Sequence, residues 1–135
     1  VKDWTWQIDW ALLPVDSKQR GAWQVQGAPL FELQMVQGHI ADMAVDVDAS
    51  ALLIYRAAWA KDSGAARVTR EAAMAKLFAS EMAEQVCSQA IQVHGGYGYL
   101  ADFPVERIYR DVRVCQIYEG TSDVQKILIQ RALAA

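Results

Sequence analysis

The chain has little of what metal sites, nucleic-acid interfaces and membrane spans require. It has 2 cysteines and 2 histidines in 135 residues, without the paired spacing of a zinc site. Its formal net charge of -3 argues against a nucleic-acid ligand, whose phosphates need clustered Lys and Arg. No apolar run approaches the ~18 residues of a membrane span, and no charged start leads into an apolar signal segment. We therefore expect no metal site, no nucleic-acid partner and no membrane span.

What remains is the composition of a globular protein in a reducing compartment. Hydrophobic residues make up 53% of the chain and charged residues 21%, which is typical of one packed domain. Cys87 and Cys115 lie in helical patterns and not in a CxxC motif, so we expect buried free thiols. These features favour the cytoplasm of a bacterium or the mitochondrial matrix.

The N-terminal stretch differs in character from the rest of the chain. Apolar and polar residues alternate from Trp4 to Trp10, which indicates a short strand or an extended arm. Proline and glycine interrupt any longer periodicity there. We therefore expect an irregular N-terminal arm.

A long helical pattern begins at Leu30. Apolar or small residues recur at steps of three and four, as on the buried face of a helix. The members of this stripe are Leu33, Val36, Ile40, Met43, Val47, Ser50, Ile54 and Ala58. Asp42, Asp46 and Asp48 fall off the stripe, so we expect them to face solvent. The helix should end near Gly64, which can adopt the left-handed conformation that closes a helix.

A second long helix has a stripe of the same kind. Its members are Ala75, Phe78, Ala79, Met82, Val86, Ala90 and Val93. This helix should end at residues 94–98, and Pro104 should begin a short helix through Arg110. Ser122 and Gln125 have the spacing of a capping box, which predicts a fourth helix near the C-terminus. Two long antiparallel helices and two shorter ones predict an all-α fold of the up-and-down four-helix-bundle type.

Two short segments have residue types suited to ligand binding. In Q-V-H-G-G-Y-G, residues 92–98, the glycines either stop a helix or let a ligand approach the backbone beside the Gln92 amide. In E-G-T-S, residues 119–122, the helix start and the Thr121 hydroxyl either form a plain cap or hold a polar ligand group. We interpret Y-R-D, residues 109–111, as a structural ion-pair network.

Glu119 has three interpretations: a helix cap, a surface charge or a catalytic base. The helix dipole favours an ionised carboxylate, whereas burial beside Ile117 and Tyr118 would favour the neutral acid. We expect partial burial from these apolar neighbours. Desolvation would help a base that removes a carbon-bound proton. The residue types alone leave the three interpretations open.

The order and spacing of these motifs resemble one family. Residues 92–133, QVHGGYGYLADFPVERIYRDVRVCQIYEGTSDVQKILIQRAL, closely resemble the C-terminal signature of the acyl-CoA dehydrogenases. The resemblance extends upstream through LQMVQGHIADMAVDVDASALLIYRAAWAKDSG and EAAMAKLFASEMAEQVCSQA. It implies the C-terminal helical domain of an FAD-dependent enzyme over residues 27–135. Residues 1–26 form an arm without this resemblance.

The resemblance implies a catalytic role for Glu119. In the family, the glutamate of this motif removes the α-proton of an acyl-CoA thioester, and FAD accepts a hydride from the β-carbon. The backbone N–H of Glu119 would help to hold the thioester carbonyl. Gly120 would let the chain pass close to the substrate, and Arg131 falls where some members contact it. The positions that match cofactor contacts at the helix start are Thr121, Ser122 and Asp123.

The resemblance also implies contacts between subunits. The positions that match a segment touching the FAD of a neighbouring subunit are Gln92, Val93, His94, Gly95 and Gly96. Gln34 matches another cofactor contact. The resemblance thus implies FAD as cofactor, an acyl-CoA as substrate, electron-transferring flavoprotein as acceptor, and a homo-oligomer that is a dimer or a tetramer.

The chain departs from the family in two respects. The Arg-x-x-Phe-Gly run that usually precedes the first bundle helix has Trp23 and Gln26 in place of its Arg and Phe. The N-terminal helical domain and the middle β-domain, which supply much of the family's pocket, are absent from the sequence. Two functions are therefore open. The chain is either the catalytic domain of an acyl-CoA dehydrogenase, inactive alone, or a non-catalytic helical module for oligomerisation or partner binding.

Overall fold

A computed structural model describes residues 24–25 and 28–134, so our expectations for residues 1–23 lie outside the described residues. Two short strands, β1 (Gln24–Val25) and β2 (Ala28–Pro29), pair antiparallel. The helices are α1 (Gln34–Asp62), α2 (Thr69–His94), α3 (Pro104–Arg113) and α4 (Ser122–Leu133). Among the described residues, the 3-10 helix η2 (Leu30–Glu32) precedes α1, η3 (Gly95–Tyr99) lies between α2 and α3, and η4 (Val114–Gln116) lies between α3 and α4. The expected all-α fold with four helices is confirmed.

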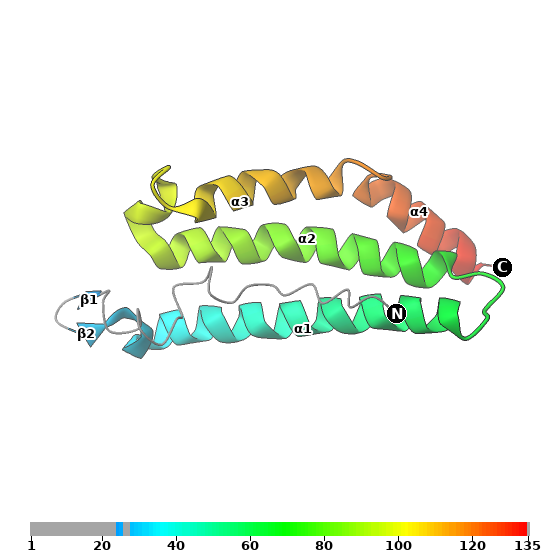
Figure 1. The fold of residues 1–135 in the computed structure, drawn as a ribbon, viewed down its shortest axis with the longest axis horizontal. Helices are drawn as coiled ribbons and strands as arrows, with labels where there is room; N and C mark the ends of the chain where they lie inside the picture. The colour runs from blue at the N-terminus through cyan, green and yellow to red at the C-terminus, as the bar shows by residue number, and fades with distance from the viewer. Residues whose placement is uncertain (1–23, 26–27, 135) are drawn as a thin grey trace.

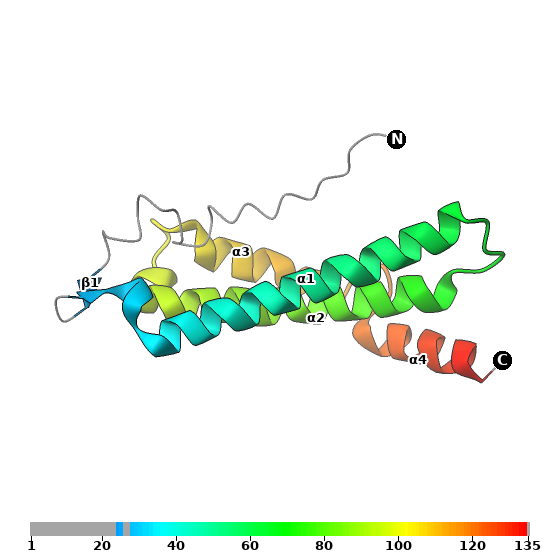
Figure 2. The ribbon, with the colours of Figure 1, turned by 90° about the horizontal axis from the view of Figure 1, so that it is seen from below.

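Helix α2 is the central element of the described structure. Helices α1 and α2 form an antiparallel pair, and α3 and α4 follow one another along the opposite side of α2 (Figure 1). Seen from below, α1 runs obliquely across α2, and α4 diverges from it towards the C-terminus (Figure 2). Because α3 and α4 are joined by η4 and a short turn, the residues before α4 lie against the middle of α2.

The ends of the helices follow from local residue types. Gly64 has φ 82°, and its N–H and that of Ala65 bind the carbonyls of Lys61 and Ala60 at 3.1 Å each. This is the left-handed closure expected for the first long helix. Pro104 occupies the first turn of α3, as expected, because its missing N–H is not needed there. The helix runs to Arg113, one turn beyond the predicted end.

The core lies between α1, α2 and α3. Met43, which is 1% exposed, packs with Ala90 and Val105 as the centre of this core. The partly buried residues around them are Ile40, Val86, Ile91 and Phe103. The predicted α1 stripe is confirmed at its centre, where Val47 and Ser50 are also buried. Its outer members differ: Leu33, Ile54 and Ala58 are exposed.

One face of α1 has no covering element among the described residues. Its large apolar side chains are Val45 (68% exposed), Leu52 (68%), Tyr55 (64%) and Trp59 (71%). Their spacing of seven, three and four residues places them on one side of the helix. We call this set the α1 outer face. None of the helices described is both long and apolar enough to cross a membrane.

Candidate functional site

The turn before α4 contains two consecutive residues in the left-handed region. Glu119 has φ 56° and Gly120 has φ 91°. Glu119 is the one non-glycine residue with positive φ among the described residues. A side chain in this conformation costs about 1–3 kcal/mol and persists only where neighbouring groups hold it. This turn is therefore a strained element at the position where the sequence predicts a functional residue.

Two side chains from different helices bind the carbonyls of this turn. The Lys76 ammonium of α2 donates to the Gly120 carbonyl at 2.7 Å. The Gln125 amide of α4 donates to the carbonyls of Gly120 at 3.1 Å and Glu119 at 3.3 Å. Gln125 is 6% exposed, and Lys76 is half-buried. A Cβ added to Gly120 would lie 2.8 Å from the Gln125 amide nitrogen, so the turn also needs glycine for space.

The start of α4 leaves backbone donors without acceptors. Within the described residues, no acceptor binds the N–H groups from Glu119 to Asp123. Thr121 is the N-cap, because its hydroxyl accepts from the Val124 N–H at 3.3 Å. The predicted capping box is thus wrong by one position: Gln125 turns back to the carbonyls of the turn, and the Ser122 hydroxyl is buried with no partner found among the described residues. The exposed side of this helix start presents N–H groups and the Thr121 hydroxyl.

The side chain of Glu119 is exposed in this chain, which corrects the expectation of partial burial. Ile117 is 56% exposed and Tyr118 is 52% exposed, so neither shields the carboxylate. A hydrogen bond between the Tyr118 hydroxyl and Cys115 Sγ, at 3.5 Å, raises the pKa of Tyr118. The charges of Cys115 and Glu119 act in the same direction. The phenol beside Glu119 is therefore neutral at physiological pH.

A second set of contacts fixes the segment that enters the turn. The Gln116 amide donates to the Glu84 carboxylate at 2.5 Å and to the Ser80 carbonyl at 3.3 Å. Arg113 lies 3.7 Å from the same Glu84 carboxylate. The ion-pair network predicted for residues 109–111 is not found among the described residues. Arg113, one turn later, makes the ion pair to α2 instead.

The other glycine-rich segment lies at the far end of α2. Val93 and His94 are buried, and His94 Nδ1 lies 2.7 Å from the Ala90 carbonyl. Their side chains therefore have a structural role. Gly95 has φ 61° and ends α2, as the helix-stop interpretation expects. A Cβ added to Gly98 would lie 2.7 Å from the Ile91 carbonyl, so η3 packs tightly on α2.

The structure separates the predicted cofactor residues into two groups. Lys76, which holds the Glu119 turn, and Gln92 are 16 residues apart on α2, which is about 24 Å at a rise of 1.5 Å per residue. Gln34 begins α1 at the same end of the antiparallel pair as Gln92 (Figure 1). Gln34, Gln92, Gly95 and Gly96 are exposed. One chain therefore does not bring the two groups to a single site.

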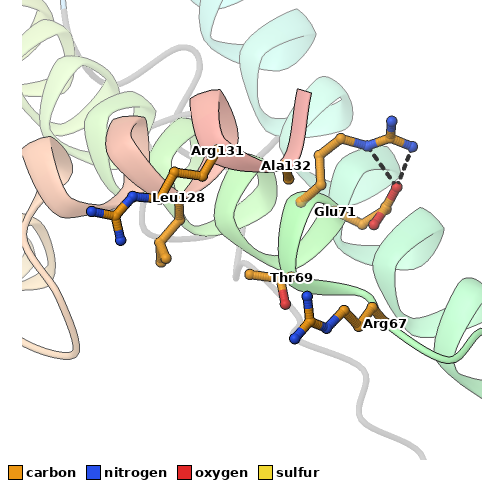
Figure 3. A pocket seen from close by; sticks show the side chains of 7 residues that line it. Arg67, Thr69, Glu71, Leu128, Arg131 and Ala132 are labelled. Carbon is orange, nitrogen blue, oxygen red and sulfur yellow. Dashed lines mark hydrogen bonds and ion pairs between the residues drawn. The ribbon is translucent and has the colours of Figure 1, made fainter. Parts of the chain in front are cut away.

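Arg131 lines a pocket of about 440 Å³ between α4 and the start of α2. The other lining residues are Arg67, Thr69, Arg70, Glu71, Leu128 and Ala132. Figure 3 shows the Arg131 side chain extending away from Thr69 and Arg67. The Arg70 guanidinium donates to Glu71 at 2.6 and 2.9 Å, and this hydrogen bonding holds the pKa of the Glu71 carboxyl below its ordinary value.

Sequence reasoning missed the roles of Lys76 and Gln125. Lys76 lies at helical spacing from two buried residues, Ala73 and Ser80. A lysine on that face of an alanine-rich helix is a signal of a buried polar contact, because an ammonium group needs an acceptor when it leaves water. The acceptor itself, a carbonyl 44 residues away, has no local signature.

Comparison with known proteins identifies the family. Residues 18–134 match the family described as "Acyl-CoA dehydrogenase, C-terminal domain". The chain is 48% identical over 107 residues to the probable acyl-CoA dehydrogenase YngJ of Bacillus subtilis, covering 79% of this chain and 28% of that protein. It is 50% identical over 103 residues to the mitochondrial short-chain specific acyl-CoA dehydrogenase of Homo sapiens, covering 76% of this chain and 25% of that protein. The family match begins within residues 1–26, and the division at residue 27 stays a prediction.

Solved structures agree with this match. Butyryl-CoA dehydrogenase from Megasphaera elsdenii is similar with a TM-score of 0.82 and 39% identity, over 93% of this chain and 32% of that chain. The chain thus spans about a third or less of the length of these relatives. It belongs to the acyl-CoA dehydrogenase family, and the part that it matches is the C-terminal helical domain.

Proposed function

We propose that this chain is the catalytic C-terminal domain of an FAD-dependent acyl-CoA dehydrogenase, with Glu119 as the base that removes the α-proton of an acyl-CoA thioester. The observation that carries the proposal is the turn before α4. There an exposed carboxylate lies on a strained backbone, next to N–H groups that no acceptor among the described residues binds. A surface charge without a function would not need side chains from two helices to hold a left-handed glutamate.

The residues present fit a polar, anionic cofactor. Free N–H groups and a hydroxyl at the start of a helix suit phosphate or carbonyl oxygens, because the helix dipole adds to their hydrogen bonds. Thr121 and Asp123 are the side chains at this start that would contact FAD, with the backbone of Ser122. Gly95 and Gly96 have open space around them, with no atom within 4 Å of an added Cβ. Bound FAD would supply the acceptor for the β-hydride.

Each group of the turn would have a separate task in the reaction. The Glu119 carboxylate would take the α-proton, and the Glu119 N–H would donate to the thioester carbonyl oxygen as negative charge develops there. Gly120 would let the backbone pass close to the substrate. Because Glu119 is exposed here, the walls that exclude water would come from the bound acyl chain and from domains outside this segment.

The partners follow from the same proposal. The two separated groups of cofactor residues suit a homo-oligomer, in which the Gln92–Gly96 end of one subunit would meet the FAD of its neighbour. Electron-transferring flavoprotein is the acceptor that we propose. It is named in the description of one similar structure, with a TM-score of 0.82, and the relative CarC is a subunit of a caffeyl-CoA reductase-Etf complex. A bacterial cytoplasm or the mitochondrial matrix would supply both partners.

A chimaera tests the proposal directly. Residues 27–134 would replace the C-terminal helical domain of the Megasphaera elsdenii butyryl-CoA dehydrogenase. The expected result is a protein that purifies with FAD and is reduced by butyryl-CoA. The same chain without added domains should bind FAD weakly and show no turnover. A chimaera that folds and binds FAD but is not reduced would contradict the proposed role of this domain.

A second candidate function has support from the α1 outer face. Four large apolar side chains on one exposed face are more than a monomer usually leaves uncovered. A non-catalytic helical module that self-associates would use such a face and leave Glu119 idle. Light scattering of the wild type and of Leu52→Lys tests self-association, with Asp48→Asn on the same helix as control. A monomeric wild type at micromolar concentration would argue against this candidate.

A further inference from the structure

We propose that Lys76 and Gln125 are positioning residues that hold the Glu119 turn in its left-handed conformation and direct the N–H groups of Gly120 and Thr121 away from these two donors. The inference extends the proposed function of this turn and rests on it, because only that function gives the held conformation a role in catalysis. Its geometry can be tested without any catalytic assay.

The two donors act on the turn itself and not on the helices that it joins. Lys76 binds the Gly120 carbonyl, and Gln125 binds the carbonyls of both Glu119 and Gly120. Both carbonyls of the strained residues are therefore held by side chains that come from α2 and α4. The Lys76 contact is charge-assisted, which makes it the stronger of the set.

Holding the carbonyls determines where the N–H groups point. In a trans peptide the C=O and the N–H of one unit point in opposite directions, and no cis peptide occurs among the described residues. The Glu119 carbonyl shares its peptide with the Gly120 N–H, and the Gly120 carbonyl shares its peptide with the Thr121 N–H. Because Lys76 binds from the α2 side, the N–H of Thr121 is directed away from α2.

The helix cap does not explain these contacts. Thr121 already caps α4 through the Val124 N–H, so α4 does not need Lys76 to begin. Packing of α4 on α2 has its own ion pair, between Lys126 and Glu81 at 3.7 Å. Lys126 thus offers a matched control: it is a lysine that joins the same two helices but touches no carbonyl of the turn.

The experiment uses the whole 135-residue chain and NMR scalar couplings that report the backbone φ of Glu119. Lys76→Met should abolish the left-handed coupling pattern at Glu119, because the strained residue loses its charged donor. Gln125→Glu keeps the shape but places a carboxylate against two carbonyls, and it should have the same effect at pH 7. Lys76→Arg keeps a charged donor and should restore the wild-type pattern.

The same spectra distinguish a positioning role of Lys76 from a merely structural one, with Lys126→Met as the control. Lys126→Met should lower the melting temperature without changing the couplings of Glu119. A merely structural role for Lys76 predicts this same result for Lys76→Met, and that result would overturn the proposal. If Lys76→Met unfolds the chain, the Gln125→Glu and Lys76→Arg spectra still decide it. Loss of the coupling pattern together with an unaffected rate for Glu119→Gln in the chimaera would sustain the positioning and refute the proposed function.

Discussion

The turn before α4 and the turn after α2 are both glycine-containing helix boundaries, and they are held by different means. The Glu119–Gly120 turn is bound through its carbonyls by side chains from two other elements. The Gly95–Tyr99 segment instead folds back on α2, where Gly98 packs against the Ile91 carbonyl. The first turn therefore has N–H groups that no acceptor in the described part of the chain binds, whereas the second is held by close packing of its own backbone.

This difference teaches that glycine content alone does not identify a ligand-binding turn. Both segments have positive φ at a glycine, and both follow or precede a helix. What separates them is the source of the contacts that hold them. A turn held by distant donors can present its amides to a ligand, while a turn held by packing offers mainly its exposed glycines, here Gly95 and Gly96.

The largest effect is expected at Glu119. In the chimaera, Glu119→Gln keeps the size of the side chain but removes the negative charge that would take the proton. Flavin reduction by butyryl-CoA should fall by at least ~10²-fold, the lower end for loss of a positioned general base. Flavin content should stay unchanged, because the backbone donors remain. Stopped-flow reduction measures the rate, with Glu106→Gln on α3 as control.

The cap interpretation of Glu119 predicts another result. Loss of a favourable charge near the start of α4 would lower stability by up to ~1 kcal/mol and leave the rate nearly intact. A melting temperature that falls while the rate of reduction holds would therefore assign Glu119 to the helix end and refute its role as base.

The second effect concerns the packed turn. Gly98→Ala places a Cβ 2.7 Å from the Ile91 carbonyl and 2.9 Å from the His94 Cβ, both of which are rigid neighbours. We expect a loss of about 1–3 kcal/mol in the free energy of unfolding, as for overpacking. Gly96→Ala, where the added Cβ meets nothing within 4 Å, should change stability by less than about 1 kcal/mol. Thermal or urea melts compare the two, and equal losses would contradict the difference between them.

The sequence predicted those helix ends that are determined by the residue at the end itself. The end of α1 at Gly64 and the start of α3 at Pro104 follow from the conformations that these two residues allow. The predicted partial burial of Glu119 was wrong, because Ile117 and Tyr118 are themselves more than half exposed and do not cover its carboxylate. Apolar neighbours bury a carboxylate only when another surface covers them.

Contacts between residues that are far apart in the sequence could not be predicted from local sequence patterns. The carbonyl that Lys76 binds is 44 residues away, and neither residue belongs to a motif that specifies the other. The resemblance to a family supplied Glu119 as a candidate, but the means by which its backbone is held became visible only in three dimensions. The same limit applies to Arg113, whose partner Glu84 lies on another helix.

The register of the α4 cap gives a third prediction. Thr121→Ala removes the hydroxyl that accepts from the Val124 N–H and should cost about 1 kcal/mol of stability. Ser122→Ala removes a buried hydroxyl with no partner found among the described residues and should be neutral or slightly stabilising. Thermal melts of both variants distinguish the observed cap from the capping box that the sequence predicted. A larger loss of stability for Ser122→Ala than for Thr121→Ala would instead support the predicted capping box.

The smallest effect is expected at the N-terminal end of α2, the helix that both turns contact. The hydrogen bond from Arg70, with added attraction from Arg56 at 3.7 Å, lowers the pKa of Glu71 in the folded chain. The unfolded state then binds the proton more readily than the folded state, so this contribution to stability is present above the ordinary glutamate pKa. It is lost as the pH falls through the lowered pKa of the folded state.

Glu71→Gln should therefore flatten the fall of the melting temperature below about pH 5 relative to wild type. Because the side chains of Arg70 and Arg56 are 42% and 50% exposed, salt ions can screen their charges, and the difference should shrink in high salt. A melting curve for Glu71→Gln that falls as steeply with acid as that of wild type would show that Arg70 and Arg56 do not stabilise this end of α2 through Glu71.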